Sequence, residues 1–145
     1  MSDPYSQYKE LLTRYGVKIT TQRIIILHVI DEGTNQRLTA EIIGERAREH
    51  IPAIHQGTVY RTLETLRKHN IISETRFDDQ AAEYELIGAH PHHHLICEKC
   101  RRRWEVADEI FTELREQTRL RYGFNIRADH LALTGICAEC EKTQR

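Results

Sequence analysis

The sequence predicts an α+β fold, in which an N-terminal winged helix-turn-helix domain precedes a small α/β domain. Three observations predict it. Helical patterns fill the first 70 residues, two short alternating segments follow them, and two C-x-x-C pairs come after residue 96. We place the domain boundary at residue 88, so that residues 1–88 form the first domain and residues 89–145 the second.

The composition of this 145-residue chain is that of a water-soluble globular protein, with 30% charged and 7% aromatic residues. No stretch is apolar enough to cross a bilayer, so we expect no membrane partner. The net charge of −1 means that any DNA contact must come from a local basic patch. Residues 1–30 lack the pattern of a secretory signal, which predicts a cytoplasmic protein.

Four segments of the first domain have helical signals. They cover residues 5–15, 22–31, 40–50 and 56–69. Thr20 or Thr21 suits the N-cap of the second and Thr39 that of the third. The fourth places Val59, Leu63 and Leu66 on one buried stripe at helical spacing. Strands over residues 71–76 and 83–87, with a turn at 78–80, complete the layout of a winged helix, in which such a helix enters the major groove.

The opposite face of the fourth helix carries Tyr60 and Arg61. An arginine can pair with phosphate or guanine, and a tyrosine can contact phosphate and a thymine methyl group. These side chains could instead simply solvate a helix face. Their position before a helix stop and a ribbon favours binding of double-stranded DNA. The candidate DNA-binding residues are Lys18, Arg23, Gln56, Thr58, Tyr60 and Arg61.

The second domain combines strand and helix patterns. Strands over residues 94–97 and 103–106 form a hairpin, a helix covers 108–122, and further strands cover 124–126 and 130–136. The alternation over residues 131–133 suits an exposed sheet edge that pairs with a second copy of the chain, which predicts a homodimer.

All four cysteines of the chain lie in the two C-x-x-C pairs. They are Cys97, Cys100, Cys137 and Cys140. Two such turns can complete a tetrahedral thiolate shell, so we predict a structural Zn²⁺. Redox-active thiols and two disulfides are the alternatives. Disulfides need an oxidising compartment, which nothing in the sequence indicates.

A histidine cluster precedes the first cysteine pair and comprises His90, His92, His93 and His94. On a strand, His92 and His94 point to the same face, as two ligands of one metal must. The alternative is that some of these histidines only solvate a loop. We therefore predict a second metal site that includes His92 and His94.

Five segments, in this order and spacing, resemble the ferric uptake regulator superfamily along nearly the whole chain. They are residues 16–23, 57–63 and 84–86, the histidine cluster with Cys97-x-x-Cys100, and His130-Leu-Ala-Leu with Cys137-x-x-Cys140. The resemblance implies a homodimeric, metal-dependent DNA-binding repressor of metal-uptake or stress genes, with a C-terminal dimerisation domain.

The resemblance also implies ligands for the regulatory metal. Carried over by position they are Glu85, His92, His94 and Glu105, and a further metal site would draw on His90, His93, Glu113 and His130. Arg37 stands where many members have another histidine, and a cation cannot bind the metal, so the site either has four ligands or takes another from elsewhere, for which His55 is a candidate. Two nitrogens and two oxygens suit Zn²⁺, with Fe²⁺ next and Mn²⁺ also compatible. A peroxide-sensing repressor of the same superfamily stays open.

Two other classes of function are less consistent with the sequence. A zinc hydrolase would hold a water on the histidine and glutamate set. The chain shows no phosphate-binding loop and no H-E-x-x-H helix, so we do not expect an enzyme. A metal-storage module would leave the helix with Tyr60 and Arg61 unexplained.

Overall fold

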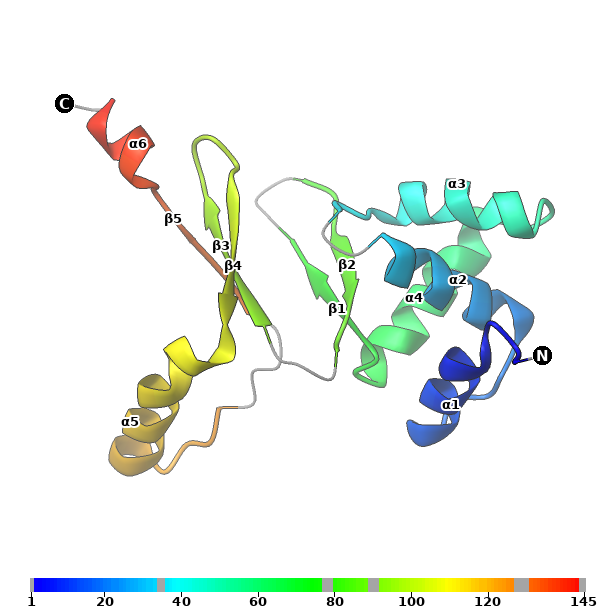
Figure 1. Ribbon diagram of the computed structural model, residues 1–145, viewed down its shortest axis with the longest axis horizontal. Coiled ribbons are helices and arrows are strands. Elements are labelled where there is room, and N and C mark those ends of the chain that lie inside the picture. Colours follow the sequence, from blue (N-terminus) through cyan, green and yellow to red (C-terminus); the bar gives the residue numbers. More distant parts are fainter. Residues whose placement is uncertain (1, 34–35, 77–79, 89–91, 127–130, 144–145) are drawn as a thin grey trace. The chain divides into compact units, whose positions relative to one another are not determined.

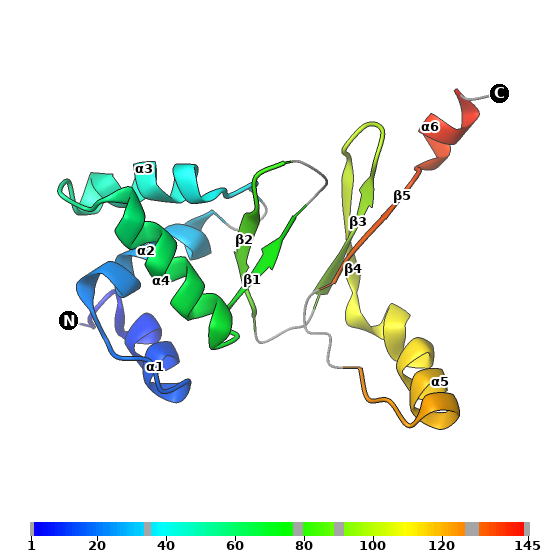
Figure 2. The same ribbon diagram turned by 180° about the vertical axis from the view of Figure 1, so that it is seen from behind.

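The chain forms two compact units, Met1–Ile87 and Gly88–Arg145. The structure, a computed structural model (Figures 1 and 2), describes residues 2–33, 36–76, 80–88, 92–126 and 131–143. Helices dominate the first unit and a three-stranded sheet the second, which confirms the predicted α+β class. Among the described helices, none has the length and apolar character needed to cross a membrane.

The first unit is a four-helix array followed by a two-stranded antiparallel hairpin. Its elements are α1 (Ser6–Arg14), α2 (Thr21–Glu32), α3 (Ala40–His50), α4 (Gln56–Lys68), β1 (Ile72–Thr75) and β2 (Glu83–Leu86). We call the β1–β2 hairpin the wing. Part of its predicted turn, residues 78–79, falls outside the described residues. An isolated bridge between Thr39 and Glu83 ties the wing to the start of α3.

Local capping explains where these helices begin and end. The Thr20 side chain accepts a hydrogen bond from the Arg23 amide, and Thr39 does the same for Ile42. Beyond α4, Asn70 adopts the left-handed conformation with φ 59°, which asparagine tolerates better than most residues. Side-chain caps and helix stops therefore set the helix boundaries close to those predicted.

The core of the first unit forms around α2. That helix buries apolar residues on nearly every side, among them Ile26 and Leu27. The α4 stripe of Val59, Leu63 and Leu66 is buried against this core, as the sequence predicts. Because the stripe fixes the rotation of α4, the polar side of the helix faces outward.

The second unit is a three-stranded sheet with strand order β4-β3-β5. Its strands are β3 (His92–Cys97), β4 (Arg103–Ala107) and β5 (Ala132–Gly135). β3 and β4 form an antiparallel hairpin, whereas β5 pairs with β3 in parallel. The chain passes from β4 to β5 through a 3-10 turn, η1 (Asp108–Phe111), and the helix α5 (Thr112–Tyr122).

Three details of the second unit differ from the predictions. The predicted helix 108–122 begins as the 3-10 turn η1, where Phe111 is buried. The strand predicted at 124–126 is wrong, because this segment pairs with no described strand and Phe124 is 63% exposed. A helix that we did not predict, α6 (Ala138–Lys142), carries the last cysteine. Its alanine, glutamate and lysine residues favour a helix.

Candidate metal centres and nucleic-acid interface

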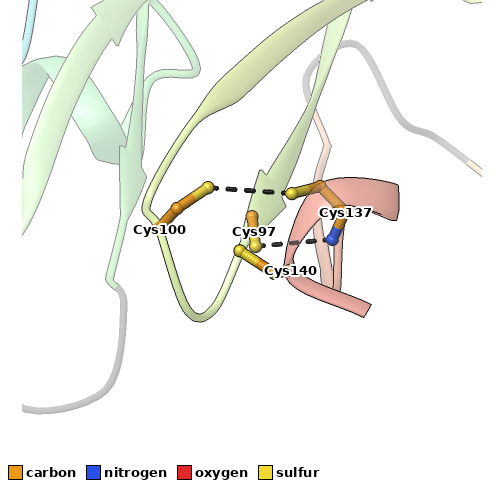
Figure 3. Close-up of side chains that lie close together, drawn as sticks. All are labelled: Cys97, Cys100, Cys137 and Cys140. Carbon is orange, nitrogen blue, oxygen red and sulfur yellow. Dashed lines mark hydrogen bonds between the residues drawn. The ribbon is translucent and has the colours of Figure 1, made fainter. Parts of the chain in front are cut away.

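The four cysteines converge at one end of the second unit (Figure 3). Cys97 ends β3, Cys100 follows in the turn to β4, and Cys137 and Cys140 lie at and within α6. Their sulfur atoms all lie within 4.8 Å of one another, and the Sγ atoms of Cys100 and Cys137 are 3.8 Å apart. A tetrahedral zinc with Zn–S bonds of about 2.3 Å requires S···S distances of about 3.8 Å. The donor set and its spacing therefore fit Zn²⁺.

The electrostatics of the cluster also favour a cation. Backbone amides of Cys100 and Cys137 point at the Cys97 sulfur and lower the pKa of Cys97 to about 6. The Cys140 thiol hydrogen-bonds to Cys137, and this bond, with burial and the neighbouring sulfurs, raises the pKa of Cys140 to about 12. A full set of thiolates is thus unfavourable by itself, and a bound dication would remove the repulsion.

His92 and His94 lie side by side on β3. Their rings are 5.1 Å apart between centroids and nearly perpendicular, and both side chains are partly buried. Glu105 of β4 stands directly opposite His94 in the antiparallel register, so its carboxylate lies on the same face of the sheet. Two imidazoles and a carboxylate on one face are a donor set that suits Zn²⁺ or Fe²⁺.

Glu85, the fourth predicted ligand, belongs to the first unit. It lies on β2 opposite Ser73, whose hydroxyl donates to the Glu85 carbonyl over 3.4 Å. The Glu85 side chain is partly buried. Its role as a metal ligand stays a proposal.

The further metal site falls only partly within the described residues. His90 and His130 lie outside them. The buried ring of His93 points to the face opposite His92 and His94, and both of its nitrogens have protein partners, Asp108 and the Leu131 amide. Glu113 lies in the first turn of α5. Both ring nitrogens of His93 are thus already used in hydrogen bonds to protein groups.

Neither Asp108 nor Arg115 was singled out from the sequence, although Asp108 contacts His93 of the histidine cluster and Arg115 contacts Asp108. Arg115 donates to both Asp108 oxygens, and Asp108 accepts from His93. These two interactions lower the pKa of Asp108 to about 2. In the sequence Asp108 reads only as the start of a helix, and nothing local connects it to His93, 15 residues earlier.

The outward face of α4 presents the predicted DNA-binding pair. The Tyr60 side chain is 51% exposed, and Arg61 is exposed and donates to the Thr58 hydroxyl over 3.1 Å. A hollow of about 320 Å³ lies between the start of α2 and α4, with Thr58 and Arg61 among its lining residues. Arg23 also lines it and donates to the Lys18 carbonyl. Guanidinium and hydroxyl groups around such a hollow suit a phosphate.

Gln56 is the candidate DNA contact that the structure turns away from this surface. Its amide donates to the Ala40 carbonyl over 2.9 Å, and its oxygen accepts from Arg48. A Cβ atom at Gly44 would lie 2.1 Å from that oxygen. Glycine at position 44 therefore leaves room for this side chain. Through its hydrogen bonds to Ala40 and Arg48, Gln56 links α3 to α4 and restricts the angle between the two helices.

Acidic side chains neutralise part of the basic surface near the wing. A groove of about 930 Å³ between α4 and the wing contains two arginines, Arg67 and Arg76. Arg67 pairs with Glu64 at 2.7 Å, and Arg76 pairs with Glu74 at 3.2 Å. On the other side of α4, Arg61 donates to the Thr58 hydroxyl, so that side is our candidate for a phosphate contact.

The sequence is similar to that of known proteins along almost the entire chain. The model of the ferric uptake regulator family matches residues 14–134, which include the α4 face, the wing, the histidine strand and the first cysteine pair. The chain belongs to the ferric uptake regulator family. It is a metal-responsive transcriptional regulator.

Relatives of this family member agree in both sequence and fold. The ferric uptake regulation protein of Bacillus subtilis (strain 168) is 31% identical over 143 residues, covering 97% of this chain and 96% of that protein. The ferric uptake regulator from Pseudomonas aeruginosa, solved with manganese, has a TM-score of 0.76 at 26% identity, covering 90% of this chain and 98% of that one. A zinc-bound manganese uptake regulator has a TM-score of 0.60 at 27% identity, with 90% and 98% covered.

Proposed function

We propose that this family member is a homodimeric repressor of metal-uptake or stress genes that binds its DNA operator when a regulatory divalent metal is bound. The main observation that supports this proposal is that His92 and His94 lie on one face of the sheet, with Glu105 opposite His94. These three side chains offer two nitrogens and a carboxylate to a single ion. Repression would follow from filling of that site, and release from its emptying.

Glu85 completes the proposed regulatory site. It lies on the wing strand β2, in the unit that carries α4, whose outward face is the proposed DNA-recognition surface, whereas the other ligands belong to β3 and β4. A metal bound by both sets would hold the winged unit at one angle to the dimer, so that both recognition helices meet the major groove. A 100-fold coupling between metal and DNA would correspond to about 2.7 kcal/mol.

The cysteine cluster holds a structural Zn²⁺ in this proposal. Its sulfurs come from the end of β3, the turn that follows it and the start of α6, so the ion joins two distant segments of the second unit. Such a closed thiolate site suits a structural ion and not a sensor of metal supply. The regulatory ion is Zn²⁺ or Fe²⁺, with Mn²⁺ compatible with the same ligands. The solved relatives, one with manganese and one zinc-bound, support a divalent metal at this site.

Exposed apolar side chains support the homodimer. In the second unit Ile110, Leu114 and Leu120 of the η1–α5 segment are 48–64% exposed, and Leu133 of the edge strand β5 is 44% exposed. Apolar surface gathered on one small unit marks a protein interface. A second copy of the chain would cover it, and we expect the dimer to act in the cytoplasm.

The deciding experiment is a titration of operator affinity with Zn²⁺, Fe²⁺ and Mn²⁺, with total metal content measured in parallel. The wild-type protein should bind the operator about 100-fold more tightly in the presence of its regulatory metal. His92→Ala should lose this response and keep one zinc per chain. His50→Ala, which alters an exposed histidine at the end of α3, is the matched control. Full metal-dependent binding by His92→Ala would place the regulatory site elsewhere.

Operator contact is tested on the α4 face. Tyr60→Ala and Arg61→Ala should each weaken operator binding by about 1–3 kcal/mol, because each removes a phosphate or base contact. Tyr15→Ala removes an exposed tyrosine of the same unit, 42% exposed, and should leave affinity unchanged. Metal content and dimerisation should be equal in all of them. Unaltered affinity of both α4 variants would remove α4 from the DNA interface.

A further inference from the structure

His93 sits between the two metal-binding histidines but takes part in a different network. Its side chain is 0% exposed, and its ring packs edge-on against Phe111 with centroids 4.5 Å apart. Nε2 lies 2.7 Å from an Asp108 oxygen, and Nδ1 accepts a hydrogen bond from the Leu131 amide at 2.9 Å. Both ring nitrogens and one ring face are therefore occupied by protein.

The hydrogen bonds fix the state of the ring. Because the Leu131 amide can only donate, Nδ1 must present its lone pair, and the proton of the neutral ring sits on Nε2 and is donated to Asp108. In this tautomer the single lone pair is already used. A metal could bind His93 only by displacing the Leu131 amide or by taking the Nε2 proton.

The same contacts join β3 to three other segments. Asp108 opens η1 directly after β4, and it is held by Arg115 of α5, whose Nη1 donates over 3.0 Å. Leu131 precedes β5, and its carbonyl accepts from the His94 amide at 2.8 Å, so one residue contacts His93 and His94 together. Through His93, the strand bearing the metal ligands is anchored to the segment with the exposed apolar side chains.

We propose that His93 is a positioning residue for the regulatory metal site, not a ligand of a further metal. It fixes the position of the β3 backbone at His92 and His94 relative to η1, α5 and β5. Both imidazoles are therefore aligned before the ion binds. This inference rests on the proposed function of His92 and His94 as regulatory ligands. It assigns Asp108 and Arg115 the role of supporting His93, as carboxylates and their partners support metal-site histidines in general.

Metal titration of the purified full-length protein without DNA tests the assignment, with Zn²⁺ as the probe. His93→Phe keeps a ring against Phe111 and removes both hydrogen bonds. Asp108→Asn keeps the shape of the side chain and removes the charge. Both variants should bind as many ions per chain at saturation as the wild type, with the regulatory affinity reduced about 10-fold. Glu116→Gln removes an exposed carboxylate of α5 that pairs with Arg119, and it should change neither quantity.

Two results would overturn the proposal. One is the loss of one ion per chain in His93→Phe at saturating Zn²⁺, with the affinity of the remaining sites unchanged, since a ligand would then have been removed. The other is wild-type affinity in Asp108→Asn. If His93→Phe does not fold, Asp108→Asn decides the question, because Asp108 is partly exposed and all the histidines remain.

A spectroscopic measurement reads the ring directly. In ¹⁵N spectra of the wild-type protein, the His93 ring nitrogens should keep the pattern of the Nε2–H tautomer as Zn²⁺ is added, whereas those of His92 and His94 should shift. If Zn²⁺ moved the ¹⁵N chemical shifts of the His93 ring to the values of a metal-bound imidazole, the proposal would be contradicted. Because no DNA is present, these outcomes are separate from any failure of metal-dependent operator binding, which would refute the proposed function alone.

Discussion

The two units of this regulator are built on opposite principles. In the first, α2, α3 and α4 bury a continuous apolar cluster that includes Leu27, Ile43 and Leu63. In the described part of the second, the buried apolar side chains are Ile96, Cys97 and Phe111, and the buried polar one is His93. One of these four is a proposed zinc ligand and another is held by hydrogen bonds.

The helices α2 and α5 show the contrast most clearly. They are of similar length, but α2 has six buried residues and α5 has none. Apolar side chains of α5, such as Leu114 and Leu120, instead face outward. A small unit with so thin a core needs a metal or a partner chain to be stable. The first unit should therefore fold by itself, whereas the second should depend on its zinc and gain further stability from its copy.

The largest expected effect comes from removing the structural zinc. Zinc bound by thiolates contributes about 10 kcal/mol to the folding of small domains, so strong chelation or Cys97→Ser should unfold the second unit. The helical spectrum of the first unit should persist. Circular dichroism, the molecular mass in solution and the zinc content, measured on the same sample, check whether only the second unit unfolds. A cooperative loss of both units would contradict the contrast drawn between them.

Two leucine-to-alanine substitutions, one in α4 and one in α5, compare how much a leucine side chain contributes to the stability of each unit. Leu63→Ala in α4 removes a side chain that is 1% exposed and should cost about 3 kcal/mol of unfolding free energy in the first unit. Leu114→Ala in α5 removes one that is 48% exposed and should cost far less in the isolated chain. Urea unfolding below the dimer dissociation constant measures both. Equal losses would mean that α5 is buried within its own chain.

Dimerisation is the next smaller effect. Leu114→Asp places a charge on the exposed face of α5 and should weaken self-association by about 2 kcal/mol, roughly 30-fold in Kd. Tyr15→Asp makes a comparable change on the first unit and should leave association unaltered. Analytical ultracentrifugation at several concentrations distinguishes them. A normal dimer with Leu114→Asp would require a different interface.

The smallest effect concerns the end of α5. Gly123 has φ 62°, in the left-handed region, and an added Cβ would meet nothing within 4 Å. Gly123→Ala should therefore destabilise the second unit by about 1 kcal/mol through backbone strain alone. Gly135→Ala is the control, because its Cβ would also meet nothing and its φ is ordinary. Thermal unfolding of the zinc-loaded protein compares the two, and equal melting temperatures would exclude the strain.

Much of the fold could be read from local patterns, and the failures have physical reasons. The α3 boundaries and the α4 stripe followed from capping residues and apolar spacing. The segment 124–126 failed because a strand needs a neighbour, and periodicity does not show whether one is available. The prediction that Gln56 contacts DNA is untested, but the hydrogen bond from its amide to the Ala40 carbonyl of α3 could not be read from its place on α4.

The sequence by itself determined the donor chemistry, since C-x-x-C spacing and alternating histidines fix which side chains can share an ion or a face. It also determined which stripe of α4 is buried. Only the tertiary structure decided how the remaining polar groups are used: that His93 is held by Asp108 and Leu131, and that the Gln56 amide donates to the Ala40 carbonyl. Those choices depend on contacts between distant segments, which short-range spacing does not encode.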